Sequence, residues 1–202
     1  MTKIKLCGLT RQIDIRKANE LRPDYVGFVF YPKSKRFITP KHAMKLRGLL
    51  DPEVRAVGVF VDEPPEKIAV LTEGGVIDIA QLHGHEDAEY LKRLRELTDK
   101  PVIKAFRIEK PQDCAPAEEY PSDFLLLDSG MGSGQTFDWS AVSGVRREYF
   151  LAGGLNAENV SAAIRSLHPF AVDVSSGIET DGVKDLNKMA AFVAAVRKED
   201  AI

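Results

Sequence analysis

The chain has 202 residues, enough for one domain with a hydrophobic core that needs no disulfide bonds. Its 28 Lys and Arg residues are interleaved with 30 Asp and Glu residues, and this even mixture argues against nucleic acid or an anionic membrane as a partner. No signal-peptide pattern or bilayer-length apolar run is found, and the two cysteines lack a metal-type spacing. The composition favours a cytoplasmic protein with a small-molecule partner and leaves the oligomeric state open.

Short apolar runs alternate with helical patterns in the first half of the chain. Each run is rich in β-branched or aromatic residues and is followed by a polar loop or a helix start. Thr10 is placed to cap the first helix, and Thr39 with Pro40 opens the second. The predicted strands are 3–7, 25–30, 55–61 and 76–82, and the predicted helices are 10–21, 39–50, 64–71 and 87–97.

The second half repeats this plan with more interruptions. Three prolines after the fifth strand leave room only for a short helix, and a glycine-rich stretch at 129–135 follows the sixth strand. The predicted strands are 101–107, 124–128, 149–152 and 170–174, and further helices are predicted near 139–142, at 156–167 and at 186–196.

Eight strand-then-helix units with no second domain predict an α/β fold, a single-domain (β/α)8 TIM barrel over residues 1–202. The alternative is an open doubly wound sheet. That fold needs fewer strands and usually carries G-x-G-x-x-G after its first strand, whereas this chain has Cys7-Gly-Leu-Thr.

The carboxyl ends of barrel strands meet at one pocket, so the residues that finish strands are the candidates for chemistry. Cys7 ends the first strand and Asp128 ends the sixth, which places a thiol and a carboxylate on different walls of the same opening. That arrangement suits a proton transfer with a separate acid and base. The alternatives are a small buried hydrophobe at Cys7 and a turn cap at Asp128.

Glycines and serines after strands six, seven and eight predict a phosphate site, because they offer free backbone N–H groups near a helix N-terminus. The alternative is a set of flexible loops and tight turns. Arg36 is either a carboxylate anchor or part of a solvated basic loop. The candidate phosphate-binding residues are Gly132, Gly134, Gly153, Gly154, Ser175, Ser176 and Gly177.

Other polar residues have weaker claims. Gln81, His83 and Asp173 finish strands and are candidates for the pocket, while Asp78 lies within a predicted strand and is taken as structural. The run His83-Gly-His-Glu86 suggests a metal, but no further ligand accompanies it at a suitable spacing, so no metal is predicted.

The motifs together resemble the phosphoribosylanthranilate isomerases of tryptophan biosynthesis, and the resemblance covers essentially the whole chain. Its order and separations are more specific than any one motif. The motifs are Lys5–Thr10, Gly27–Phe30, Ser34–Arg36, Val57–Val61, Gln81–Gly84, Leu127–Asp128, Phe137–Trp139, Leu151–Leu155 and Asp173–Glu179.

The resemblance implies an Amadori rearrangement of N-(5-phosphoribosyl)anthranilate to 1-(2-carboxyphenylamino)-1-deoxyribulose 5-phosphate. It assigns the general acid to Asp128, the general base to Cys7 and the anthranilate carboxylate to Arg36, with the phosphate held by the glycine and serine loops. It implies no cofactor. The alternatives are another phosphosugar barrel, such as an epimerase or a relative of indole-glycerol-phosphate synthase with a lysine in place of Cys7, and a non-catalytic barrel that binds a phosphorylated metabolite.

Overall fold

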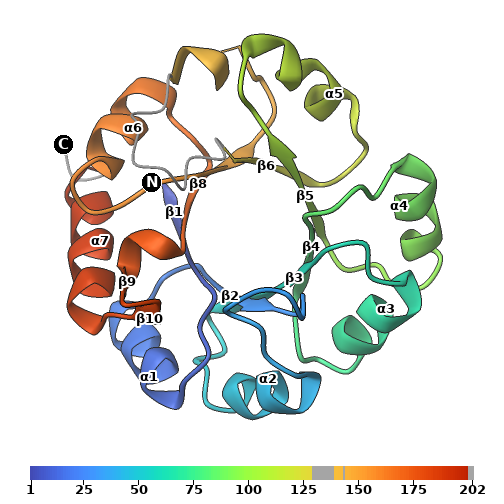
Figure 1. Ribbon diagram of the computed structural model, residues 1–202, viewed down its shortest axis with the longest axis horizontal. Coiled ribbons are helices and arrows are strands. Elements are labelled where there is room, and N and C mark those ends of the chain that lie inside the picture. The colour runs from blue at the N-terminus through green and yellow to red at the C-terminus, as the bar shows by residue number, and fades with distance from the viewer. Residues whose placement is uncertain (129–138, 143, 200–202) are drawn as a thin grey trace.

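Eight parallel strands form a closed ring in the computed structural model, which describes residues 1–128, 139–142 and 144–199 (Figure 1). Each strand pairs with its neighbours in chain order, and β1 closes the ring by pairing with β8. The predicted barrel is therefore confirmed. The strands are β1 Lys3–Cys7, β2 Tyr25–Val29, β3 Arg55–Phe60, β4 Ile79–Leu82, β5 Val102–Arg107, β6 Phe124–Asp128, β7 Tyr149–Ala152 and β8 Ala171–Val174.

The helices surround this ring on its outside (Figure 1). A two-stranded hairpin follows β8, and in the described part of the chain three short 3-10 helices lie in the connections. The α-helices are α1 Gln12–Leu21, α2 Pro40–Arg47, α3 Pro65–Glu73, α4 Ala88–Arg95, α5 Cys114–Glu119, α6 Val160–Leu167 and α7 Leu186–Glu199. The 3-10 helices are η1 Pro111–Asp113, η2 Trp139–Val142 and η3 Ser176–Ile178, and the hairpin strands are β9 Glu179–Thr180 and β10 Val183–Lys184. Within the described ranges, no helix has the length and apolar character of a bilayer-spanning segment.

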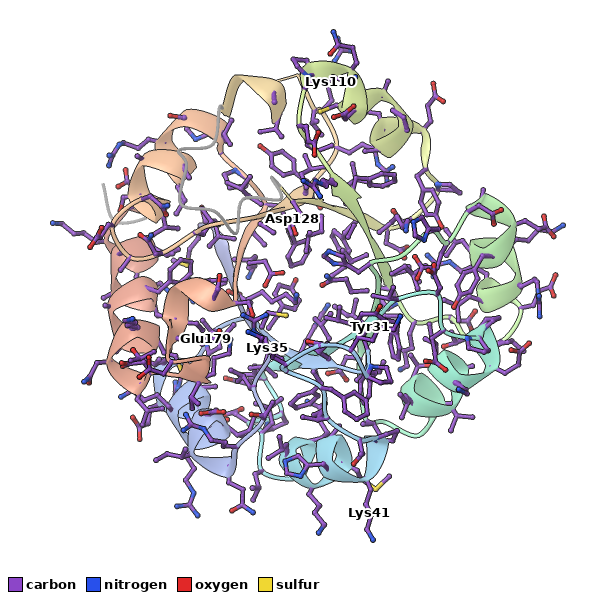
Figure 2. All side chains as sticks on the ribbon, in the orientation of Figure 1. Tyr31, Lys35, Lys41, Lys110, Asp128 and Glu179 are labelled. Atoms are coloured by element: carbon purple, nitrogen blue, oxygen red, sulfur yellow. The ribbon has the colours of Figure 1, made fainter. Side chains whose placement is uncertain are left out.

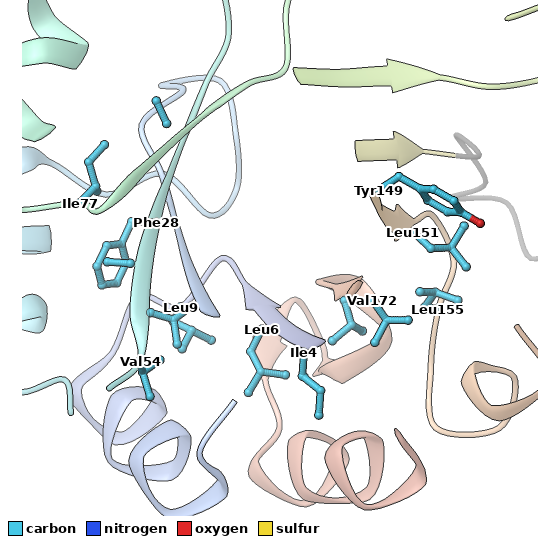
Figure 3. Close-up of a cluster of buried hydrophobic side chains, with 14 of the residues drawn as sticks. Ile4, Leu6, Leu9, Phe28, Val54, Ile77, Tyr149, Leu151, Leu155 and Val172 are labelled. Atoms are coloured by element: carbon cyan, nitrogen blue, oxygen red, sulfur yellow. The ribbon is translucent and has the colours of Figure 1, made fainter. Parts of the chain in front are cut away.

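Strand β1 shows how alternation sorts side chains between two cores. Ile4 and Leu6 are fully buried in the layer between strands and helices (Figure 3), where they belong to the main apolar cluster. Lys5 and Cys7 lie on the opposite face, which is the inside of the barrel. Successive side chains of a strand point to opposite faces, so the residues of odd number in β1 are the ones that reach the interior.

An apolar floor fills the amino-terminal end of the barrel. Phe150 lies at its centre, with ring centroids 5.3 Å from Tyr25, 5.9 Å from Phe124 and 5.7 Å from Phe170. Val57 and several other aliphatic side chains complete this cluster, which is separate from the layer under the helices. Among the described residues, this floor closes the amino-terminal end, and a cavity lies at the carboxyl-terminal end of the barrel.

Several element boundaries differ from the sequence prediction because side chains bond the backbone there. The predicted cap Thr10 is wrong: the N-cap is Arg11, and the Asp14 carboxylate accepts from the N–H groups of Thr10 and Arg11 at 3.2 and 2.9 Å. Thr39 does cap α2, since its hydroxyl accepts from the N–H of His42 at 3.2 Å.

Two further elements begin later than predicted. Strand β4 begins at Ile79 rather than 76, and the Asp78 carboxylate just before it accepts from the N–H of Ala56 at 2.7 Å and from Arg47 at 3.1 Å. Helix α6 begins at Val160 rather than 156, because the side chain of Asn156 takes nearby backbone N–H groups into a turn. Asp78 therefore has the structural role expected of it.

Candidate active site

A cavity of about 370 Å³ opens at the carboxyl-terminal end of the barrel. Every predicted site residue that the structure describes, except Gly177, lines it, while Gly132 and Gly134 lie outside the described residues. Its volume falls in the usual range for small-molecule sites. The lining residues are Cys7, Val29, Tyr31, Ser34, Arg36, Val59, Val61, Gln81, His83, Asp128, Ala152, Gly153, Gly154, Leu155, Asp173, Ser175 and Ser176.

Cys7 ends β1 in a space that a neighbouring glycine provides. A Cβ on Gly27 of β2 would lie 2.6 Å from the Cys7 sulfur, so only glycine leaves room for the thiol. The next residue, Gly8, has φ of 79° and turns the chain away from the strand. Burial raises the pKa of the Cys7 thiol; the nearby charge of Lys5 opposes this, and Asp173 adds to it.

Asp128 ends β6 on another wall of the cavity, and Figure 2 shows it at the inner rim of the ring, while Lys41 and Lys110 lie outside it. Its Oδ2 is 3.7 Å from Nε2 of His83, which belongs to the segment after β4. Burial lowers the pKa of His83, with Asp128 opposing and Lys5 adding to the effect. The imidazole is therefore neutral near pH 7, and its Nε2 edge faces the Asp128 carboxyl group.

Beneath these groups lies a polar layer that the sequence analysis only partly found. The ammonium of Lys5, which is fully buried, donates to Gln81 Oε1 at 2.7 Å and to Asp173 Oδ2 at 2.8 Å. Burial disfavours the charged lysine, but the charges of Asp173 and Cys7 and their hydrogen bonds outweigh it and raise the pKa of Lys5. Lys5 was missed as a site residue, although its position two residues before Cys7 places it on the same face of β1.

Arg36 reaches the cavity from the loop after β2, but a protein carboxylate already holds one edge of it. Its Nε and Nη2 atoms pair with the two oxygens of Glu179 at 2.6 and 2.8 Å. Burial opposes ionisation of Glu179, yet hydrogen bonds from Arg36 and Lys184 lower the pKa of this carboxyl. Neither Glu179 nor Lys184 was predicted, and their pairing across the hairpin of β9 and β10 depends on a fold that local sequence does not reveal.

The loops after β7 and β8 adjoin one another at the cavity edge. Gly153 and Gly154 have φ of 96° and 64°, a backbone region that favours glycine. A Cβ on Gly177 would lie 1.9 Å from the carbonyl oxygen of Leu155, so Gly177 allows the two loops to touch rather than lining the cavity itself. Lys184 fixes the second loop by donating to the carbonyl of Ser175 at 2.8 Å.

The two histidines of the run His83–Glu86, for which no metal was predicted, face different partners. The Nδ1 of His85 is 3.0 Å from Asp62, and its side chain is 95% exposed, whereas the Nδ1 of His83 is 3.0 Å from the amide nitrogen of Gln81. In the part of the chain that the structure describes, no group of three His, Cys, Asp or Glu side chains could hold a metal ion.

The chain matches the family model described as N-(5'phosphoribosyl)anthranilate (PRA) isomerase over residues 4–195. It is 45% identical to N-(5'-phosphoribosyl)anthranilate isomerase of Endomicrobium trichonymphae, with 98% of this chain and 99% of that protein covered. The crystal structure of phosphoribosyl anthranilate isomerase from Thermotoga maritima is 42% identical, with a TM-score of 0.90 and coverage of 98% of this chain and 100% of that one. Another isomerase structure, in complex with reduced 1-(o-carboxyphenylamino)-1-deoxyribulose 5-phosphate, is 40% identical over 98% of this chain and 100% of that one, with a TM-score of 0.88. The chain thus belongs to the N-(5'-phosphoribosyl)anthranilate isomerase family.

Proposed function

We propose that this chain converts N-(5-phosphoribosyl)anthranilate to 1-(2-carboxyphenylamino)-1-deoxyribulose 5-phosphate, an Amadori step of tryptophan biosynthesis. The observation that carries the proposal is the placement of Cys7 and Asp128 on separate walls of one cavity, beside two loops with glycine-rich or serine-rich ends. The membership of the family adds the substrate. We further propose that the reaction needs no cofactor, because no step transfers electrons or a group to or from a second molecule, and that it takes place in the cytoplasm.

The chemistry divides between the two walls. Asp128 protonates the furanose ring oxygen, so the bond from that oxygen to C1 breaks and C1 becomes a protonated imine with the anthranilate nitrogen, which carries the positive charge. Cys7, as thiolate, then removes the proton from C2, and the electron pair moves to form an enolamine. The enolamine tautomerises to the ketone, with a proton returning to C1. Asp128 loses one proton and Cys7 gains one, so the enzyme must exchange both before the next turnover.

Binding of the substrate ends falls to the cavity rim. Gly153, Gly154, Ser175 and Ser176 provide backbone and hydroxyl donors for the phosphate, with Gly132 and Gly134 proposed for the same role. Gly177 supports this site indirectly through the contact between loops. The ribose is proposed to lie above polar side chains of the cavity, those of Gln81, His83 and Asp173.

The anthranilate carboxylate is assigned to Arg36. Because Glu179 holds the Nε and Nη2 edge, we propose that the substrate meets the edge that includes Nη1, for which no bond is found among the described residues. Arg36 thus remains the proposed anchor, and the structure changes only which edge of its guanidinium group is assigned to the substrate.

The test is a product assay that follows loss of anthranilate-substrate fluorescence. Asp128→Asn and Cys7→Ser should each lower kcat roughly 10²-fold or more, the scale of a lost general acid or base, while the fold persists. Cys114→Ser is the matched control, since Cys114 does not line the cavity and, among the described residues, its sulfur donates to the backbone carbonyl of Ala141 at 3.1 Å. Near-normal turnover in either active-site variant would contradict that assignment. Conversion to a different product would favour the epimerase alternative, and binding without turnover the non-catalytic one.

A further inference from the structure

Four side chains lie in a row across the barrel, in the order Lys5, Gln81, His83 and Asp128. The hydrogen bonds along this row determine the orientation of Gln81 and the position of the proton on His83. Lys5 is the starting point because an ammonium group can only donate hydrogen bonds. The atom of Gln81 that lies 2.7 Å from it must therefore be the carbonyl oxygen. The orientation of this amide is thus set by chemistry, with Lys5 itself held by Asp173 at 2.8 Å.

The orientation of Gln81 then determines where the proton of His83 lies. With its oxygen toward Lys5, Gln81 presents its NH2 group to Nδ1 of His83 at 3.0 Å. An amide NH2 can only donate, so Nδ1 must be the acceptor, and a neutral imidazole then carries its proton on Nε2. The Nε2 atom is the one that faces Asp128 Oδ2, at 3.7 Å.

We propose that Lys5 and Gln81 are positioning residues that hold His83 as the neutral Nε2–H tautomer, so that this N–H stabilises the carboxylate formed when Asp128 gives up its proton. The inference rests on the proposed isomerisation, since it assigns these residues a purpose in that reaction. The hydrogen bonds of Gln81 are to Lys5 and His83, so the effect proposed here reaches Asp128 through His83, in addition to the direct hydrogen bond of Lys5 to Cys7.

The tautomer matters because the three states of His83 would affect Asp128 differently. A neutral Nε2–H donor stabilises the carboxylate as it forms, without adding a full positive charge beside it. An imidazolium would favour the ionised carboxylate before the reaction and leave less of the acid form. The Nδ1–H tautomer would direct a lone pair at the carboxylate. The present distance of 3.7 Å exceeds a hydrogen bond, and we expect it to shorten when substrate fills the cavity.

Burial and surrounding charge support the neutral state. Burial lowers the pKa of His83; the charges that face it are Asp128 and Asp173, which oppose the shift, and Lys5 and Lys104, which add to it. The Gln81 side chain is itself only 1% exposed, so water does not compete for its amide.

The decisive variant is Gln81→Glu, which keeps the shape of the side chain and reverses its hydrogen bonding. A carboxylate can still accept from Lys5, but it must also accept from Nδ1, so His83 has to carry a proton there. In two-bond 15N–1H correlation spectra near neutral pH, we expect the wild-type His83 to show a protonated Nε2 and a bare Nδ1. In Gln81→Glu, Nδ1 should be protonated, and kcat should fall about tenfold or more with KM changed by less than about threefold.

Two controls identify the His83 signals and show the effect of the same substitution away from the cavity. The His83 signals are identified by their loss in His83→Gln, which distinguishes them from the other three histidines of the chain. Gln12→Glu, on the exposed first residue of α1, makes the same substitution away from the cavity and should leave both kcat and the His83 spectrum unchanged.

Each outcome bears on the inference. A wild-type spectrum with Nδ1 protonated overturns it without any variant, and so does a Gln81→Glu protein with the altered spectrum and unchanged kcat. Both expected results together support it. A wild-type protein that fails to turn over the anthranilate substrate overturns the proposed function and the catalytic part of this inference, whereas the spectrum alone decides the tautomer.

Discussion

Cys7 lies at the cavity where a base is needed, but its burial disfavours the reactive thiolate form. Its side chain lines the cavity but is only 8% exposed, and burial is the main cause that raises the pKa of the thiol. Lys5 and Lys184 lower it again in part. Because the thiolate is the reactive form, a raised pKa leaves less of it at neutral pH.

Alkylation kinetics should therefore report the environment of Cys7. We expect its reaction with iodoacetamide to be slow at neutral pH and to accelerate roughly tenfold for each pH unit, up to a midpoint above that of a free cysteine peptide. Mass spectrometry of the peptide that contains Cys7 separates it from Cys114. A midpoint at or below that of the free peptide would show that Lys5 outweighs burial.

Arg36, like Cys7, has a proposed role that depends on the charged groups beside it. Arg36→Met should weaken substrate binding by about 1.5–3 kcal/mol, the scale of hydrogen bonds to a charged group, and raise KM more than it lowers kcat. The substitution also leaves Glu179 with Lys184, at 2.5 Å, as its ion-pair partner among the described residues. Lys35→Met, an exposed neighbour in the same loop, is the matched control and should leave KM unaltered. An unchanged KM in Arg36→Met would place the carboxylate anchor elsewhere.

At the scale of elements, the connections after β7 and β8 behave as one unit. Gly177 touches the Leu155 carbonyl, Ser175 donates to the Cys7 carbonyl at 3.2 Å, and Lys184 of β10 donates to the Ser175 carbonyl at 2.8 Å. The last two contacts link the end of β8 to the end of β1 and to the hairpin. A substitution that moves one of these connections should therefore also displace the segments bonded to it.

Gly177→Ala tests this coupling. Its Cβ would lie 1.9 Å from the Leu155 oxygen, so the two loops must separate, and we expect a loss of about 1–3 kcal/mol in the free energy of unfolding together with a higher KM. The matched control is Gly48→Ala at the end of α2, where a Cβ would meet backbone oxygens at ordinary distances of 3.6 and 3.7 Å. Urea unfolding measures the first effect and steady-state kinetics the second. A stable Gly177→Ala protein with normal KM would show that the loops are independent.

Across the whole molecule, the regular alternation of strands and helices was enough to predict the barrel. Each predicted strand exists, because β-branched and aromatic runs separated by helical patterns leave few other arrangements. The ends of the elements were harder to predict, as at Thr10 and Asp78, where a carboxylate takes the backbone N–H groups. Such bonds depend on side-chain geometry that periodicity does not contain.

The candidate site likewise contains residues whose place in the cavity the sequence could predict and residues whose place it could not. Residues at strand ends, such as Cys7 and Asp128, could be predicted because barrel topology brings strand ends together. Lys5 could have been found from its alternation with Cys7, but a lysine in a strand usually indicates solvent. The pairing of Arg36 with Glu179 could not be found, because it joins residues 143 positions apart that only the closed ring brings together.

The proposed phosphate site offers a test of ring closure and function together. Gly153–Gly154 and Ser175–Ser176 follow neighbouring strands, and they line the same cavity as Cys7 and Asp128. In crystals soaked with phosphate or sulfate, we expect one anion contacted by backbone N–H groups of both loops on that face of the barrel. The apolar floor around Phe150 fills the amino-terminal end of the barrel interior. An anion bound only at the amino-terminal face would contradict the assignment.

A pair of glycine variants separates phosphate binding from backbone strain. Gly154 has φ of 64° at the cavity, and Gly182 has φ of 77° in the turn between β9 and β10, where a Cβ would meet nothing within 4 Å. Valine at either position must adopt a strained backbone, so Gly154→Val and Gly182→Val should each lower the thermal midpoint by a few degrees, for a cost of about 1–3 kcal/mol. Only Gly154→Val should also raise KM, about tenfold or more, because only its added side chain would enter the space of the phosphate. Equal KM values for the two variants would remove Gly154 from the phosphate site and leave its glycine explained by the turn alone.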